Sequence, residues 1–404
     1  MGGSILSGLK NDSYDIVVGI PSFNNRSTIK HVVEIASRGL KEYFPKMRSC
    51  IVNSDGGSSD GTEGSFYSAN SMGLDLLSFK YTGISGKGSA MRSILQLASR
   101  LDARAVVFLD SDLRSVEPFW IERLAGPIID LNASYVAPYY IRHKYDGTIT
   151  NSICYPLTTS LYGRKVRQPI GGDFGVGREM IDYYMSVPEE TWNSDISRFG
   201  IDIWMTTSAI NEASGKIYQA ALGSKIHDVK DPGKQLGNMF KEVVGTLFDL
   251  MEKYHRKWEA VSGYETAPVY GDVVGGEAEP LQVDLANMMG KCYEGVRTRL
   301  DFSESVLGGE ITRKLSTFSK ENAMVTDDLW VEVVYRISSA YRRRELRNKL
   351  IELLVPVYFA RVADFVTRTL EMDQEEAERE TERLLERFVN TKEELRKIWE
   401  KNTR

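Results

Sequence analysis

Short apolar runs alternate with stretches of helical spacing through the first third of the chain. This alternation is typical of a mainly parallel sheet with helices on its faces. The strands that it predicts cover residues 15–20, 49–53, 75–81 and 103–109. The helices that it predicts between them cover residues 27–39, 63–72 and 89–98. Strand–helix units repeated in this order favour a nucleotide-binding α/β fold.

The middle of the chain has a different pattern of apolar residues and glycines. From residue 126 to residue 227, aromatic-rich strand candidates such as 134–141 alternate with glycine loops such as 171–177. We expect this part to extend the same sheet in a mixed arrangement. Residues 262–283 are rich in Gly, Pro and Glu, and we expect them to form loops.

The rest of the chain is mostly helical in pattern. Apolar residues recur at helical spacing after residue 233, and long charged amphipathic helices are expected over residues 314–404. Thr391 and Glu394 predict a capping box at the start of the last helix. We therefore expect an α/β domain over residues 1–235 and a mainly helical region over residues 236–404.

The composition excludes several classes of protein. The 404 residues are 42% hydrophobic and 26% charged, which is typical of a globular protein and not of a disordered or collagen-like chain. With 51 basic and 56 acidic residues the net charge is -5, so no general attraction to nucleic acid or to anionic membranes is expected. The three cysteines show no metal-binding spacing, and no apolar run has the length of a membrane span. We therefore expect a soluble protein of the reducing cytoplasm.

The most specific chemical signal is the pair of carboxylates in Asp110-Ser111-Asp112, directly after the fourth predicted strand. Carboxylates just beyond the carboxyl end of a strand can hold a hard divalent cation, which in turn bridges the phosphates of a nucleotide. The same pattern also occurs on ordinary turns. Its position after a buried strand favours the functional interpretation.

Two glycine-rich loops follow other predicted strands. Asp55 and the glycines of residues 56–61 follow the second strand, where a carboxylate can accept from a base or ribose. Lys87 lies between two glycines at a predicted helix start, which suits a phosphate. The chain has neither a Walker A loop nor a GxGxxG at its first helix, so the P-loop and classical dinucleotide folds are disfavoured.

Further candidates lie later in the α/β part. His227 is flanked by acidic residues, and an imidazole would complete a metal site if the chain returns it to Asp112. On its own, such a residue is more often a surface histidine. Asp173 and Asp202 each follow a glycine-containing turn, although an acid at a first helical turn is also good helix electrostatics. Tyr139 and Arg142 are candidates for a small-acid pocket, or for packing between strands.

Taken in order, seven short motifs of this sequence resemble one family. They are Ile20–Asn24 (IPSFN), Asn53–Asp60 (NSDGGSSD), Gly86–Gly88 (GKG), Asp110–Asp112 (DSD), Gly171–Asp173 (GGD), Gly200–Asp202 (GID) and His227–Asp228 (HD). The chain over about residues 14–235 resembles the GT-A fold nucleotide-sugar glycosyltransferases. Within these it is most similar to the retaining enzymes that make glucosylglycerate or mannosylglycerate, including the glucosyl-3-phosphoglycerate synthases.

This resemblance implies a GT-A (Rossmann-like) α/β fold with a helical C-terminal extension, and it implies roles for individual residues. Residues implied to bind the nucleotide-sugar are Pro21 and Asn24 beside the nucleotide, Asp55 at its base, Lys87 at its phosphate, and Asp110, Ser111, Gly171, Gly172 and Asp173. A divalent metal, Mg²⁺ or Mn²⁺, is implied with ligands from Asp112, His227 and Asp110. Asp202 is implied to contact the sugar or the accepting hydroxyl, and Asp112 and Asp202 are the expected catalytic residues.

The implied activity is transfer of glucose or mannose from a UDP- or GDP-linked sugar to a glycerate-type acceptor, which makes a compatible solute. No carboxylate stands out as a covalent nucleophile, so a same-face substitution is favoured, in which the leaving phosphate oxygen takes the acceptor's proton. In relatives that act on 3-phosphoglycerate, an Arg shortly before a Thr holds the acceptor phosphate. The matching stretch here, Thr148–Asn151 (TITN), keeps Thr150 but has no Arg.

The acceptor therefore stays open between D-glycerate, 3-phosphoglycerate and glucosylglycerate. The residues expected to bind it are Tyr139, Arg142, Thr150 and Arg164, with Lys144 as a further source of positive charge. Two other functions stay open: a GT-A enzyme that acts on a polysaccharide or lipid, and a nucleotide-sugar-binding protein without turnover. No nucleic-acid or membrane partner is expected. The amphipathic C-terminal helices are expected to pack on the core or on a second subunit, and a homodimer is the expected assembly.

Overall fold

A computed structural model describes residues 8–226, 232–273, 278–279, 281–319, 322 and 324–402. The chain divides into two compact units, and each is interrupted in sequence. The first contains residues 1–141, 166–229 and 267–279, and the second contains residues 142–165, 230–266 and 280–404. The predicted boundary near residue 235 thus lies close to residue 230, where the chain passes from the first unit to the second. Two shorter segments, residues 142–165 and 267–279, belong to the other unit than predicted.

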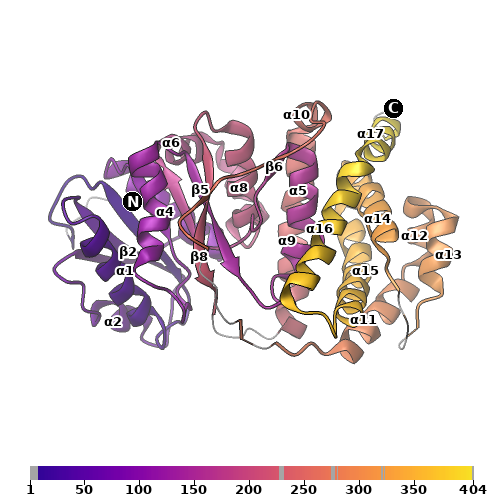
Figure 1. Ribbon diagram of the computed structural model, residues 1–404, viewed down its shortest axis with the longest axis horizontal. Coiled ribbons are helices and arrows are strands. Elements are labelled where there is room, and N and C mark those ends of the chain that lie inside the picture. The colour runs from indigo at the N-terminus through magenta and orange to yellow at the C-terminus, as the bar shows by residue number, and fades with distance from the viewer. Residues whose placement is uncertain are drawn as a thin grey trace. The chain divides into compact units, whose positions relative to one another are not determined.

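The first unit is built on a mixed sheet, and Figure 1 shows its strands and the helices packed on them. In its described part the strand order is β10-β8-β5-β7-β4-β1-β2-β3, and β7 pairs antiparallel with both of its neighbours. The strands are β1 (Ile16–Ser22), β2 (Ser49–Asp55), β3 (Asp75–Lys80), β4 (Ala105–Phe108), β5 (Tyr135–Ile141), β7 (Phe174–Gly177), β8 (Ile217–Ser224) and β10 (Val269–Tyr270).

Helices cover both faces of this sheet. They are α1 (Ile29–Tyr43), α2 (Thr62–Tyr67), α3 (Lys87–Arg100), α4 (Phe119–Leu131), α6 (Arg178–Ser186), α7 (Glu189–Trp192), the short 3-10 helix η3 (Asp195–Ser197) and α8 (Ile201–Glu212). Helices α1 and α4 pack together on one face, where Val18, Val33 and Leu124 belong to a common apolar core. Helix α3 packs on β1 and β2 and against α6 and α8. Burial on both faces explains why β1, β2 and β4 are nearly continuous apolar runs.

The sheet brings the carboxyl ends of several strands to one edge. Strands β1, β2 and β4 run parallel, with Ser22 opposite Asp55 and Gly19 opposite Phe108. Asp110 lies two residues after the last residue of β4, so it reaches the same edge. In open α/β sheets ligands bind at this edge, where the connecting loops diverge.

The second unit is helical apart from one short strand pair. It contains the π-helical turn η2 (Thr150–Cys154), α5 (Tyr155–Tyr162), β6 (Arg164–Lys165), α9 (Pro232–Lys253), α10 (His255–Glu259), β9 (Glu265–Thr266), α11 (Leu285–Arg297), α12 (Leu300–Leu307), α13 (Gly309–Ser316), α14 (Asp327–Ala340), η4 (Arg344–Leu346), α15 (Arg347–Arg368), α16 (Gln374–Asn390) and α17 (Lys392–Lys401). Helix α15 packs against α9, α11 and α14, and α16 packs against α5 (Figure 1). Trp258, Trp330 and Trp399 are all buried in this unit.

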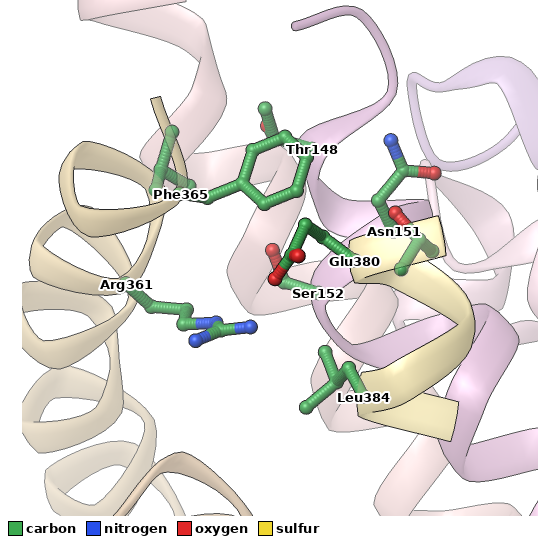
Figure 2. A pocket seen from close by; sticks show the side chains of 9 residues that line it. Thr148, Asn151, Ser152, Arg361, Phe365, Glu380 and Leu384 are labelled. Atoms are coloured by element: carbon green, nitrogen blue, oxygen red, sulfur yellow. The ribbon is translucent and has the colours of Figure 1, made fainter. Parts of the chain in front are cut away.

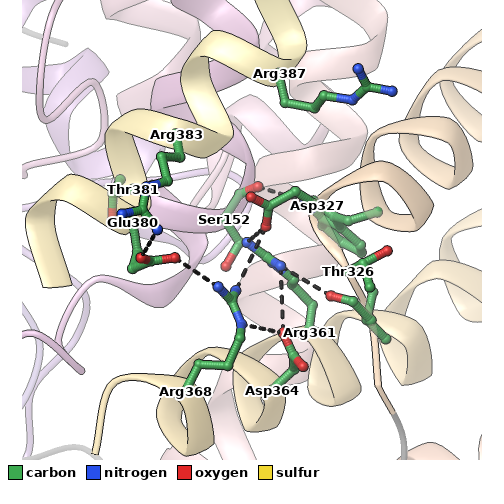
Figure 3. Close-up of polar contacts among 12 residues, drawn as sticks. Ser152, Thr326, Asp327, Arg361, Asp364, Arg368, Glu380, Thr381, Arg383 and Arg387 are labelled. Atoms are coloured by element: carbon green, nitrogen blue, oxygen red, sulfur yellow. Dashed lines mark hydrogen bonds and ion pairs between the residues drawn. The ribbon is translucent and has the colours of Figure 1, made fainter. Parts of the chain in front are cut away.

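A buried ion-pair cluster ties three of these helices together (Figure 3). The Arg361 side chain is 3% exposed, and its Nη2 lies 2.6 Å from Asp327 Oδ1. Arg368 Nε lies 2.9 Å from Asp364 Oδ2, and Arg368 Nη1 lies 2.8 Å from Glu380 Oε2. The cluster therefore links α14, α15 and α16 through their side chains.

Three differences from the sequence predictions have clear physical reasons. Residues 142–165 pack with the helical unit, because the apolar helix α5 is buried against α16. Residues 267–279 group with the sheet, because β10 adds to the edge of β8. The predicted capping box at Thr391 and Glu394 is wrong. Helix α17 starts one residue after α16 ends, so the Thr391 hydroxyl donates back to the carbonyl of Arg387 at 2.7 Å.

None of the helices in the described part of the chain is both long and apolar enough to cross a membrane. The cysteines Cys50, Cys154 and Cys292 are buried free thiols.

Candidate active site

The loop after β2 is organised by the carboxylate of Asp55. Its Oδ1 accepts from the backbone N–H groups of Gly57 and Ser58, at 2.7 and 2.6 Å. Its Oδ2 accepts from the hydroxyls of Ser58, at 2.6 Å, and of Ser22, at 3.0 Å. Asp55 is thus held at the strand end by a dense set of hydrogen bonds.

Asn24 closes the other side of the same loop. It lies in the left-handed region with φ 55°, and its Oδ1 accepts from the N–H of Ser59 at 3.0 Å. Its own N–H donates to Ser58 Oγ at 2.8 Å. Pro21 is buried in β1 opposite Ser54. The structure therefore brings the predicted nucleotide residues Pro21, Asn24 and Asp55 together at one strand edge.

A chain of alternating charges runs beside this loop. Lys87 opens helix α3, and its Nζ lies 2.9 Å from Asp110 Oδ1 and 3.2 Å from Asp202 Oδ2. Lys225 follows strand β8, and its Nζ lies 2.9 Å from Asp110 Oδ2 and 2.8 Å from Asp173 Oδ2. The order Asp202, Lys87, Asp110, Lys225, Asp173 forms a continuous network, which we call the strand-end cluster.

Lys225 was not predicted from the sequence. Its side chain is 3% exposed, and besides the two carboxylates it donates to the carbonyl of Gly171 at 2.8 Å. The available signal is weak: Lys225 ends an apolar strand and lies two residues before His227. A lysine in that place is more often the polar end of a strand, and only the fold shows that it is buried among acids.

Gly172 is required where the sugar pocket is predicted. Its φ is +91°, and a Cβ built on it would collide with the carboxylate of Asp110. Only a residue without a side chain can therefore lie over the cluster here. The next residue, Asp173, accepts from the N–H of Asp110 at 2.8 Å and from the hydroxyl of Tyr140. The predicted residues Gly171, Gly172 and Asp173 thus contact Asp110 and Lys225.

The cluster shifts the pKa values of its members in different directions. Burial raises the pKa of Asp110, but the ammonium groups of Lys225 and Lys87 outweigh this and hold that pKa well below its usual range. Burial lowers the pKa of Lys87, but Asp110 and Asp202 raise it above its ordinary value. Asp110 and Lys87 therefore stay charged at neutral pH.

Asp202 has the opposite tendency. It lies in the first turn of α8 and is 8% exposed. Burial raises the pKa of its carboxyl above the ordinary value, although Lys87 lowers it. Among the described residues its Oδ1 has no hydrogen-bond partner, while Oδ2 accepts from Lys87. A buried carboxylate oxygen without a partner is costly, and a ligand hydroxyl would satisfy it.

The predicted metal site is described only in part. Asp112 is 8% exposed, and the neighbouring Ser111 donates from Oγ to Asn25 Oδ1 at 2.9 Å. His227 lies outside the described residues. The chain just before it does return to this place, because Ile226 accepts from the N–H of Arg114 at 2.9 Å and its own N–H donates to Ser115 Oγ at 2.8 Å.

This return of the chain is what a metal site at Asp112 and His227 requires. Within the ranges that the structure describes, no three His, Cys, Asp or Glu side chains are grouped to hold a metal ion. Asp110 lies between the ammonium groups of Lys87 and Lys225, each 2.9 Å from one of its oxygens. Asp110 is therefore already paired with two cations, which disfavours its predicted role as a metal ligand.

The predicted acceptor residues are divided between the two units. Tyr139 lies on β5 in the first unit, whereas Arg142, Thr150 and Arg164 lie in the second. Arg142 pairs with Asp146 at 3.6 Å, and Arg164 pairs with the exposed Glu265 at 3.3 Å. The strand-end cluster is thus built without these three residues of the second unit.

The segment around Thr150 packs into the helical unit. Thr150 is 4% exposed, and its neighbours Thr148, Asn151 and Ser152 line a cavity together with Arg361 and Glu380 (Figure 2). This cavity measures about 10 Å³, which is room for about one water molecule. It is therefore too small for an acceptor.

Lys144 is also engaged in the second unit. Its Nζ donates to the carbonyls of Thr369, Leu370 and Met372, at 2.7, 3.2 and 2.6 Å. These carbonyls follow the end of α15, where a cation is favoured by the helix dipole. Lys144 thus closes a helix end and is not arranged to bind an acceptor.

Comparison with known proteins agrees with the predicted class. No family model matches the chain. It is 24% identical over 251 residues to the glucosyl-3-phosphoglycerate synthase of Mycolicibacterium smegmatis, with 57% of this chain and 76% of the relative covered. It is 26% identical over 264 residues to the enzyme of the same name from Petrotoga mobilis, with 59% and 74% covered.

A solved structure from Mycobacterium tuberculosis is also among the proteins to which this chain is similar. It is glucosyl-3-phosphoglycerate synthase in complex with Mn²⁺, uridine diphosphate and glucosyl-3-phosphoglycerate, with 24% identity, a TM-score of 0.47, and coverage of 61% of this chain and 83% of that one. The observed mixed sheet and the helical C-terminal region confirm the predicted α/β fold with a helical extension. Within that class the chain resembles the glucosyl-3-phosphoglycerate synthases, as predicted.

Proposed function

We propose that this chain is a metal-dependent glycosyltransferase that moves a glucosyl group from a nucleotide-sugar, UDP-glucose first, to a small glycerate-type acceptor. The observation that carries the proposal is the strand-end cluster, in which Lys87 pairs with Oδ2 of the buried Asp202, while Oδ1 has no hydrogen-bond partner among the described residues. Support comes from the relatives, which are named for glucosyl transfer to 3-phosphoglycerate. Donors that carry mannose in place of glucose, or GDP in place of UDP, are alternatives that the test includes.

The Asp55 loop, two residues of the strand-end cluster and the proposed metal ligands each have a role in this proposal. The Asp55 loop holds the base and ribose, and Lys87 at the start of α3 holds the donor phosphate. The Oδ1 of Asp202 accepts from a hydroxyl of the glucosyl group and fixes its orientation. A divalent cation held by Asp112 and His227 would neutralise the negative charge that develops on the departing diphosphate.

We propose retention of configuration by a same-face substitution. The bond between the anomeric carbon and the phosphate oxygen breaks, and a bond between the same carbon and the acceptor oxygen forms. The acceptor hydroxyl gives its proton to the departing phosphate oxygen, so no protein base is needed. Asp202 orients the sugar in this scheme, and Lys87 holds the phosphate that receives the proton.

The test is release of UDP from UDP-glucose, with Mg²⁺ or Mn²⁺ and with EDTA, in the presence of D-glycerate or 3-phosphoglycerate. We expect metal-dependent release that an acceptor stimulates, and a product with the α configuration of the donor by NMR. UDP-mannose, GDP-glucose and GDP-mannose serve as further donors. Binding of nucleotide-sugar without release of nucleotide, under every condition, would instead make the chain a binding protein and refute the proposal.

We also propose that the protein acts as a homodimer in the cytoplasm, as its amphipathic C-terminal helices and its free cysteines suggest. Light scattering coupled to gel filtration measures the assembly directly. A mass of one chain would refute the dimer without affecting the proposed reaction.

A further inference from the structure

Three side chains form a row across adjacent strands at the carboxyl edge of the sheet. Ser22 ends β1, Asp55 ends β2 and Lys80 ends β3. The register pairs Ser22 with Asp55, and Asp55 with Lys80. Side chains of residues that are paired in register point to the same face of a sheet. Lys80 therefore lies at the edge that carries the Asp55 loop, next to the carboxylate that organises this loop.

The carboxylate of Asp55 has no capacity left for a nucleobase. Each of its oxygens already accepts two hydrogen bonds, from the N–H groups of Gly57 and Ser58 and from the hydroxyls of Ser58 and Ser22. A carboxylate offers about four lone-pair sites, so a base N–H could bind Asp55 only in place of one of these donors. Asp55 thus shapes the loop, and a base placed there would need a different polar partner.

The ammonium group of Lys80 lies against the same loop. Gly57 has a φ of +90°, and a Cβ built on it would lie 3.0 Å from both Cε and Nζ of Lys80. Lys80 is exposed, and among the described residues no carboxylate or other acceptor pairs with its ammonium group. Its three N–H donors are therefore open to a ligand that enters beside the Asp55 loop.

We propose that Lys80 recognises the base of the donor nucleotide by donating a hydrogen bond to a ring oxo group, O4 of uracil in UDP-glucose. The inference rests on the proposed function, because it takes the Asp55 loop as the place of the base. An ammonium group has donors only, so it favours the oxo group of uracil over the amino group that cytosine carries at the same ring position. Lys80 thus selects the donor by its base, whereas Lys87 holds a phosphate that every donor shares.

The experiment is calorimetric titration of UDP and CDP with Mg²⁺ present, which measures this selection without turnover. Lys80→Met keeps most of the length of the side chain and removes its donors. We expect the affinity for UDP to fall about 10-fold, as for loss of one hydrogen bond to a charged group. The affinity for CDP should stay within about twofold. Because Lys80 is exposed, the substitution should leave the melting temperature unchanged.

Two further variants separate recognition of the base from attraction to the diphosphate. In Lys80→Gln the amide can donate to the oxo group of uracil or accept from the amino group of cytosine, so the preference for UDP over CDP should shrink. Lys80→Arg keeps the charge and the donors and should retain most of the preference. Lys41→Met is the matched control, because Lys41 is an exposed lysine in the last turn of α1, away from the carboxyl ends of the strands. It should change neither affinity.

The proposal for Lys80 and the proposed reaction can fail separately. An equal loss of affinity for UDP and CDP in Lys80→Met would assign Lys80 to the diphosphate and overturn its role at the base, and so would unchanged affinities for both. Transfer of glucose from UDP-glucose together with either of these results would keep the transferase and refute the contact. A preference for UDP that depends on Lys80, without any transfer of sugar, would keep the contact and refute glycosyl transfer.

Discussion

Both units of this protein bury clusters of charged side chains, and the two clusters differ in how completely they are paired. In the helical unit, the carboxylates of Asp327, Asp364 and Glu380 each pair with a guanidinium group (Figure 3). In the strand-end cluster, the buried Asp202 has one oxygen on Lys87 and one without a hydrogen-bond partner in the described part of the chain. Asp327 Oδ1 also lacks a well-directed hydrogen bond, but it lies 2.6 Å from Arg361 Nη2. The strand-end cluster instead shares two ammonium groups among three carboxylates, and Asp202 shares Lys87 with Asp110.

The difference follows from the elements that carry the charges. Arg361 and Asp364 lie on one helix, and Asp327 and Glu380 lie on helices packed against it, so side chains meet across helix faces and exclude other groups. The strand-end cluster lies where parallel strands finish and their loops diverge, which leaves space for a ligand. The comparison indicates that the balance between acids and cations, more than burial, distinguishes the two clusters.

The largest expected effect concerns the metal. Asp112→Asn removes the carboxylate proposed to bind the metal, and we expect metal-dependent turnover to fall by about 10³-fold because charge on the leaving diphosphate is no longer neutralised. The melting temperature stays unchanged within error. Calorimetric titration with Mn²⁺ measures the lost affinity directly, and Asp182→Asn on the exposed side of α6 is the control. Unaltered Mn²⁺ affinity in Asp112→Asn would show that the metal is held elsewhere.

In the helical unit, loss of a charged side chain from the ion-pair cluster is expected to lower stability and to leave turnover unchanged. Arg361→Leu leaves Asp327 and Asp364 with a weaker set of partners, and we expect the free energy of unfolding to fall by about 3 kcal/mol. Urea unfolding gives this value, while donor hydrolysis by the folded variant stays normal. Arg379→Leu is the matched control, since Arg379 forms an exposed pair with Glu375 and should cost below about 1 kcal/mol. Equal costs for both variants would contradict the comparison.

The sequence predicted much of the first unit because its signals are local. The strands that became β1 to β4 are apolar runs bounded by turn residues, and the acids of Asp110 and Asp112 follow one of them directly. The structure contains these strands as predicted, because the strands of a covered sheet have buried faces. The ends of parallel strands also meet at one edge of the sheet. That convergence places Asp55 and Asp110 at one edge, whereas Asp202 meets Lys87 from the first turn of α8.

The remainder depended on contacts that no local pattern encodes. Lys225 looks like an ordinary strand end, and its three partners come from two distant segments. The segment containing Thr150 belongs to the helical unit, because the apolar helix α5 that follows it is buried against α16.

Asp202→Asn tests the incomplete pairing itself. The amide keeps the shape of the side chain but loses the charge, and we expect turnover to fall by about 100-fold because the sugar is oriented less well. Burial raises the pKa of Asp202, so the folded state disfavours the ionised carboxyl, and the variant should be at least as stable as the parent at neutral pH. Loss of activity together with a lower melting temperature would mean that Asp202 is structural.

The pH dependence follows from the same shift. Because the pKa of Asp202 is raised, the acid limb of kcat/KM should lie above the range of an ordinary aspartate, with activity lost as the pH falls through that value. The sign for stability is opposite, since the cost of the ionised carboxyl disappears as the pH falls through the raised pKa. The stability gain in Asp202→Asn should therefore shrink on acidification. If the acid limb of kcat/KM is unchanged in Asp202→Asn, the limb belongs to the titration of another group.

The smallest expected effect concerns the start of α16, in the helical unit. Asp373 forms the capping box there: its Oδ1 accepts from the N–H of Glu376 at 2.8 Å, and Glu376 Oε2 accepts from the N–H of Asp373 at 2.9 Å. Asp373→Ala should cost about 1 kcal/mol of unfolding free energy and leave turnover unchanged. Thr391→Ser, at the place where the sequence alone suggests a cap, keeps the hydroxyl bond to Arg387 and should cost less. A larger loss of unfolding free energy in Thr391→Ser than in Asp373→Ala would contradict this. It would mean that the side chain of Thr391 caps α17.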